Sequence, residues 1–163
     1  MPSKKHTSSA RQTQPKDWDT VADSTYDVMS FYYQGSQMLQ NNKYDASIKI
    51  FEDFLAEHPD HVYADRAQFS IAKAHYLHHE YAFCVMATNY LESRYSYSLK
   101  LPEALYLRIL SYEKMGQKRS AKQTWQKMLS VYPHNPLLWQ LQKLFKTNAP
   151  NLKSSNKVYA LKE

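Results

Sequence analysis

The chain has 163 residues, 43% of them hydrophobic, which is enough for one domain with a buried core. Its formal net charge of +6 comes from the two ends, because residues 1–16 contribute +4 and residues 146–163 contribute +3. The near-neutral remainder disfavours a basic nucleic-acid-binding face, and the only two glycines, Gly35 and Gly116, are too few for a phosphate-binding loop.

The N-terminal residues 1–23 are polar and basic, and we expect them to form a disordered tail. They show neither the apolar segment of a secretory signal nor a cysteine for lipid attachment. No part of the chain approaches the ~20 consecutive apolar residues that a membrane-spanning helix needs. The simplest prediction from these observations is a soluble cytoplasmic protein.

Three segments that begin at Tyr44, Tyr81 and Lys118 repeat with a period of 37 residues. Each segment has the apolar spacing of an amphipathic helix, and Pro59 and Pro133 lie where the first and third helices must have ended. Three sets of equivalent residues carry the period: Phe51, Thr88 and Trp125; Ser47, Cys84 and Ala121; Phe54, Leu91 and Met128. The small residue in the second set would allow a neighbouring helix to approach closely.

A second helix is predicted ahead of each segment, over Thr25–Gln40, His61–His78 and Leu101–Met115. An amphipathic helix pair of this size cannot bury its apolar faces alone, so we expect successive pairs to stack. The sequence therefore predicts an all-α solenoid over residues 24–146, with residues 147–163 as a second disordered tail. The predicted parts are helix-turn-helix repeats at about 28–61, 65–98 and 102–135, and a capping helix at 136–146.

Neither a catalytic site nor a metal site is expected. His75 and His79 are four residues apart, the spacing of two ligands on one helix face, but no second ligand pair accompanies them. The only cysteine, Cys84, occupies a packing position, where a thiolate would be buried and inert. We therefore expect no enzyme activity, no cofactor and no small-molecule substrate.

The repeat pattern resembles that of the tetratricopeptide repeat family, whose usual period is about 34 residues. The middle repeat matches best, through Ala67, Phe69, Ile71, Ala72, Ala74, His75, Tyr76, Tyr81 and Cys84. The first repeat keeps Gly35, Tyr44, Phe51 and Pro59, and the third keeps Ala104, Tyr106, Tyr112, Gly116, Ala121 and Pro133. Gln34 and Arg108 depart from the family pattern, because each replaces an expected apolar residue.

The long period and the phrases YDASIKIFEDFLAEHP and ALYLRILSYEKMGQ are more specifically similar to the bacterial envelope branch of this family. That branch includes the outer-membrane assembly lipoprotein and the periplasmic coordinator of the Tol–Pal system. The resemblance implies a scaffold that binds another protein.

The resemblance also implies that the first helix of each repeat lines a concave groove where a peptide or helix is held. The candidate partner-binding residues on it are Tyr32, Arg66, Phe69, Lys73, Tyr76, Tyr106, Leu110 and Glu113. The rings of Tyr32, Phe69 and Tyr106 recur every 37 residues, and they either contact the partner or fill space between adjacent first helices. Arg66 and Lys73 beside Phe69 favour an acidic or C-terminal carboxylate-bearing segment.

The leading interpretation is a bacterial, cytoplasmic adaptor that binds a segment of a partner protein. Two alternatives remain open, an envelope-associated assembly component and a cytosolic chaperone for a secreted substrate. Nucleic-acid binding through the basic tails is the least favoured alternative.

Overall fold

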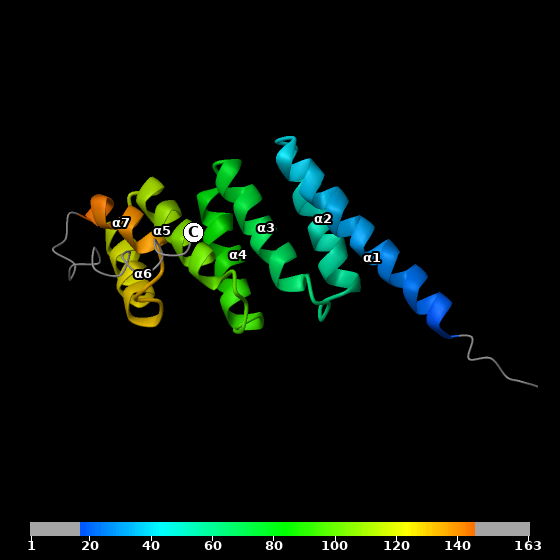
Figure 1. Cartoon of the computed structure of the whole chain (residues 1–163). Coiled ribbons are helices and arrows are strands. Elements are labelled where there is room, and N and C mark those ends of the chain that lie inside the picture. The colour runs from blue at the N-terminus through cyan, green and yellow to red at the C-terminus, as the bar shows by residue number, and fades with distance from the viewer. Residues whose placement is uncertain (1–16, 146–163) are drawn as a thin grey trace, which may run out of the picture.

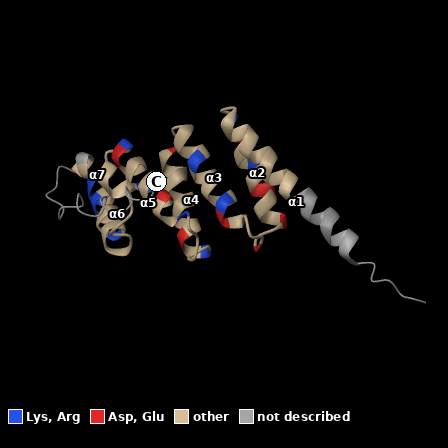
Figure 2. Cartoon of the chain, in the orientation of Figure 1, with Lys and Arg blue, Asp and Glu red and all other residues tan. Residues whose placement is uncertain are grey.

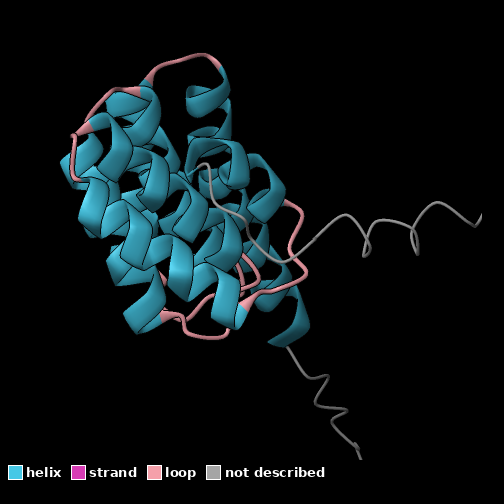
Figure 3. Ribbon diagram, turned by 90° about the vertical axis from the view of Figure 1, so that its left-hand side faces the viewer, coloured by secondary structure: helices cyan, strands magenta, loops and turns pink. Residues whose placement is uncertain are grey.

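In a computed structural model the described residues, 17–145, form helices joined by short loops, and no strand occurs among them (Figures 1 and 3). The helices are α1 (Asp17–Gln40), α2 (Tyr44–Glu57), α3 (Ala64–Leu77), α4 (Tyr81–Arg94), α5 (Leu101–Lys114), α6 (Lys118–Val131) and α7 (Leu137–Phe145). They follow one another in a row of stacked pairs (Figure 1), which confirms the predicted all-α solenoid.

The N-terminal boundary of the helical domain differs from the predicted one. The first helix begins at Asp17, earlier than the boundary predicted at residue 24. Residues 1–16 and 146–163, which contain most of the predicted tails, lie outside the described part of the chain.

The 37-residue period sets the positions of the helices. The second helices of the three repeats, α2, α4 and α6, are each 14 residues long and begin 37 residues apart. In α7, Leu138 and Leu141 occupy the positions of Leu101 and Ala104 in α5, and all four side chains are buried. Because α7 packs against α5 and α6, it acts as the first helix of a fourth repeat and covers the end of the stack.

All nine residues of the three repeating sets are buried. The set of small residues allows the close approach that its pattern predicts: Ser47 Oγ donates a hydrogen bond to the backbone carbonyl of Gly35, at 2.9 Å. A Cβ atom at Gly35 would lie 3.0 Å from ring carbons of Phe51, so the two helices of the first repeat require glycine there. Burial raises the pKa of the Cys84 thiol, as expected for a cysteine that only fills the core.

The first helices form the inner face of the stack. Helix α3 contacts both α1 and α5, and α5 contacts α7, whereas no comparable contact joins α2 to α4 or α4 to α6 within residues 17–145. The first helices therefore lie closer to one another than the second helices do. This is the arrangement that the predicted binding face requires.

The turn inside each repeat contains one residue in the left-handed backbone region. These residues are Asn42 (φ 59°), His79 (φ 64°) and Gly116 (φ 73°), again 37 residues apart. Glycine adopts this conformation freely and asparagine tolerates it, but a histidine is strained there. The exposed His79 ring contacts the Tyr81 hydroxyl, 3.0 Å from Nδ1, which compensates little of the strain.

We expect His79→Gly to raise the free energy of unfolding by about 0.5–1 kcal/mol, because relief of a left-handed strain of about 1–2 kcal/mol exceeds the entropic cost of glycine. The matched control is Gly116→His at the equivalent turn, which should lower stability by a similar amount, about 0.5–1 kcal/mol. Urea denaturation followed by circular dichroism measures both. A destabilised His79→Gly variant would show that the imidazole itself holds this turn.

Candidate protein-binding site

Four of the predicted binding residues form one stripe along α3. Arg66, Phe69, Lys73 and Tyr76 are spaced by three, four and three residues, which places them on a single helix face. Arg66 and Lys73 are both exposed. The Arg66 guanidinium lies over the Tyr63 ring, 4.8 Å from its centroid, and Lys73 makes no ion pair with any described residue. The stripe therefore presents two cations without a bound carboxylate.

Helix α5 contributes the other half of this inner face. Its Glu113 is partly exposed, and Leu110 packs onto the core formed by α5, α6 and α7. Burial, together with the neighbouring Tyr81 and Tyr106, raises the pKa of Tyr76. Tyr76 therefore remains a neutral hydroxyl, able to donate a hydrogen bond, well above neutral pH.

The three recurring rings fill the space between consecutive first helices. The Tyr32 ring lies 5.0 Å from that of Tyr63, just ahead of α3. Phe69 packs against the buried cluster that contains Leu101 at the start of α5, and Lys100 Nζ lies 5.5 Å from the ring centroid. The Tyr106 hydroxyl donates to Gln140 Oε1 of α7 at 2.9 Å. All three rings are only partly buried, so a contact with a partner remains a prediction beside their packing role.

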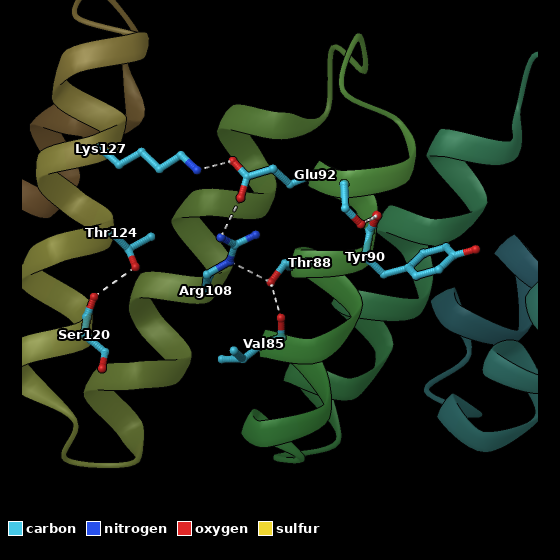
Figure 4. Close-up of polar contacts among 9 residues, drawn as sticks. Val85, Thr88, Tyr90, Glu92, Arg108, Ser120, Thr124 and Lys127 are labelled. Atoms are coloured by element: carbon cyan, nitrogen blue, oxygen red, sulfur yellow. Dashed lines mark hydrogen bonds and ion pairs between the residues drawn. The ribbon is translucent and has the colours of Figure 1, made fainter.

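A buried ionic network joins α4, α5 and α6 (Figure 4). Arg108 of α5 is only 5% exposed. Its Nε donates to Thr88 Oγ1 at 3.0 Å and its Nη1 to Glu92 Oε2 at 2.9 Å. Lys127 Nζ lies 2.8 Å from Glu92 Oε1. The Thr88 hydroxyl donates to the Val85 carbonyl, so its oxygen is oriented to accept from Arg108.

The network occupies positions that are apolar at the other two junctions between repeats. Phe51 and Ile71 share the first core cluster, and the Trp125 and Phe145 rings stack 5.0 Å apart at the third junction. The corresponding pair at the middle junction is Thr88 and Arg108, and Glu92 stands where the other repeats have Leu55 and Leu129. The small threonine leaves room for the guanidinium, and the glutamate neutralises its charge. The repeat pattern marks Arg108 as a departure, but it does not identify Thr88 and Glu92 as its partners.

The carboxylate of Glu92 is ionised at neutral pH. Burial alone would raise its pKa, but hydrogen bonds from Lys127 and Arg108 outweigh that effect, and the pKa lies below its ordinary value of 4.5. The unfolded chain therefore binds a proton at Glu92 at a higher pH than the folded chain. Glu92 consequently stabilises the fold above pH 4.5 and loses this contribution as the pH falls through its folded pKa.

We expect the wild-type chain to lose more unfolding free energy than Glu92→Gln when the pH falls from about 6 to about 3, because glutamine cannot be protonated in this range. Denaturant titrations at several pH values measure the difference. The variant should be the less stable of the two at about pH 6, where it lacks the ion pair. Parallel pH profiles of the two chains would contradict the assigned role of Glu92.

Removing one partner of the network should cost more than replacing the whole network. Glu92→Ala leaves the buried Arg108 charge unpaired and should destabilise the fold by about 3–5 kcal/mol. The triple variant Thr88→Phe, Glu92→Leu and Arg108→Ile copies the apolar first junction and should be as stable as the wild type or more stable. Arg108 Nη2 has no hydrogen-bond partner among the described residues, which adds to the cost of burying the arginine. Thermal unfolding measures both variants, and a triple variant that is less stable than Glu92→Ala would contradict this expectation.

These features define a class. Three helix pairs in a 37-residue register, closed by a seventh helix and presenting an inner face with unpaired cations, form a helical-repeat solenoid of the tetratricopeptide type.

A family model described as YfiO, outer membrane lipoprotein, matches residues 24–146, and the chain belongs to this family. No curated protein shows a significant match to the chain. The match confirms the resemblance to the envelope branch of the repeat family.

The prediction of a cytoplasmic protein is wrong, because the family consists of outer membrane lipoproteins and points to the cell envelope. That prediction rested on the N-terminal residues, whereas the family signal lies in the repeats. None of the helices described in residues 17–145 has the length and apolarity needed to cross a bilayer. In the same part of the chain, no three histidine, cysteine, aspartate or glutamate side chains lie close enough together to hold a metal ion.

Proposed function

We propose that the chain is a non-catalytic, envelope-associated interaction component that holds a segment of a partner protein on the inner face of its solenoid. The observation that carries this proposal is the exposed pair Arg66 and Lys73 on α3, beside partly buried rings, in a chain of the outer membrane lipoprotein family. We assign the interaction to a domain over residues 24–146.

The charges on the inner face favour an acidic segment with a defined orientation. Stacking on Tyr63 restricts the Arg66 side chain, which reduces the entropy lost when it binds a carboxylate. Lys100, just ahead of α5, neutralises Glu103, since its Nζ lies 2.7 Å from Glu103 Oε2. Glu113 makes no ion pair with any described residue, so it is the uncompensated acid of α5. A bound segment would therefore place its acidic groups next to Arg66 and Lys73 on α3, and it would have no acidic group next to Glu113.

Reversing both charges, in Arg66→Glu with Lys73→Glu, should abolish partner binding and leave the fold intact. Exposed substitutions usually change stability by less than about 0.5 kcal/mol. Loss of charge-assisted contacts at an interface centre costs about 2 kcal/mol or more, which is roughly a thirtyfold loss of affinity. A photoreactive phenylalanine at Ser70, between the two cations on α3, provides the measurement through crosslinks formed in the cell envelope.

The matched control is Lys118→Glu with Lys122→Glu on α6, which makes the same charge change at exposed residues away from the inner face. This control should form the wild-type crosslinks, whereas the α3 variant should lose them with an unchanged melting temperature. If the α3 variant melts normally and still forms them, the partner binds elsewhere.

A further inference from the structure

The second helices turn one exposed side outward, which we call the outer arc. In α4 it consists of Ala82, Phe83, Met86, Asn89, Tyr90 and Ser93. All six are exposed, and so are the equivalent positions of α2 and α6, apart from the partly buried Ser120. The outer arc lies on the opposite side of the stack from the inner face, so it is independent of the function proposed above.

The outer arc of α4 is apolar and carries no charge. Phe83 is 54% exposed, Met86 63% and Tyr90 52%. In contrast, α2 has Ala46, Lys49 and Asp53 at these positions, and α6 has Ser120, Gln123 and Lys127. The stacking of repeats therefore does not require large apolar side chains here. An exposed apolar stripe of this kind marks an interaction surface.

The helices on either side of this stripe have opposite charge (Figure 2). On the outer arc, α2 carries Asp45, Glu52 and Asp53, the last paired with Lys49, whereas α6 carries Arg119 and Lys127 and no acid. Across the outer face the order is therefore acidic, apolar and basic. Such a surface is complementary to a second copy of itself when the copy is rotated so that its basic end meets the acidic end of the first.

We propose that the outer arcs of two copies of this chain meet in a symmetric dimer, with the two-fold axis parallel to α4. This axis places α4 against α4 and α2 of each copy against α6 of the other, so both flanks are attractive. The alternative two-fold axis, along the row of helices, would place α2 on α2 and α6 on α6, where like charges repel. The charge order thus selects one of the two symmetric arrangements.

The common register of the repeats then identifies the facing charges. Asp45 and Arg119 occupy equivalent positions in the first turns of α2 and α6, and both are exposed. A two-fold rotation about an axis parallel to the helices leaves each residue at the same height along the helix axis. Asp45 of one copy therefore faces Arg119 of the other, and Glu52 faces Gln126. Lys127 is already bound to Glu92 within its own chain.

The surface is large enough for a dimer of moderate affinity. Helices of 14 residues are about 21 Å long and about 10 Å wide with their side chains, so three of them present roughly 600 Å² per copy. Stable interfaces bury about 800 Å² per partner. The dimer should therefore form in the micromolar range and weaken as salt screens the flanking charges.

Sedimentation equilibrium of the complete chain, at about 10–500 µM and at low and high salt, tests the proposal. The expected mass approaches twice the chain mass of 19.2 kDa as concentration rises. Met86→Glu, at the centre of the stripe, should raise the dissociation constant roughly tenfold or more without changing the melting temperature. The control Tyr97→Glu changes a large side chain that is even more exposed, at 97%, and lies outside the stripe, so this variant should dimerise like the wild type.

A charge-swapped pair tests the predicted orientation. Neither Asp45→Arg with Glu52→Arg nor Arg119→Glu with Gln126→Glu should form a dimer alone, because each places like charges across the interface. Mixed in equal amounts, the two variants should restore a one-to-one dimer, in which all facing charges are opposite. A wild-type chain that stays monomeric throughout, a Met86→Glu variant that still dimerises fully, or a mixture that stays monomeric while the wild type dimerises would each overturn the proposal.

Discussion

The whole structure depends on one packing constraint, which is that no helix pair can bury its own apolar surface. The core of each repeat is completed by the first helix of the next one. Ile71 of α3 joins the cluster of Phe51 in α2, and Phe145 of α7 covers Trp125 of α6 in the same way. The constraint also explains α7, because without it the buried face of α6 would be open to water. Stacking leaves the inner and outer faces free for other contacts.

The middle junction meets the same constraint with different chemistry. Apolar contacts tolerate some sliding between helices, but the hydrogen bonds of Arg108 to Thr88 and Glu92 have fixed directions. Lys127 extends the network to α6, so three helices are held in one register. A buried ion pair of this kind contributes little net stability. Its benefit is the defined relative position of the second and third repeats, which carry the α3 and α5 halves of the inner face.

Much of the fold could be predicted because a single period determines it. The positions of Phe51, Thr88 and Trp125 identify the buried side of each second helix, whatever residue stands there. The Arg108 network could not be predicted from one position, since it becomes visible only when three equivalent positions are compared together. The packing of Phe69 beside Leu101 and Lys100 could not be predicted either, because the spacing within one helix does not show which side chains of the next repeat reach it. The left-handed His79 follows the register of Gly116, but histidine itself gives no such signal.

Helices that pack closely in the described part of the chain belong to the same repeat or to adjacent repeats. A change at one junction between repeats therefore has to be matched mainly by residues of the two repeats that meet there. The exchange of phenylalanine, leucine and isoleucine for Thr88, Glu92 and Arg108 has this form, because the flanking junctions keep their apolar cores. A stack built in this way can diversify one junction at a time, so chains of very different sequence can retain the same architecture.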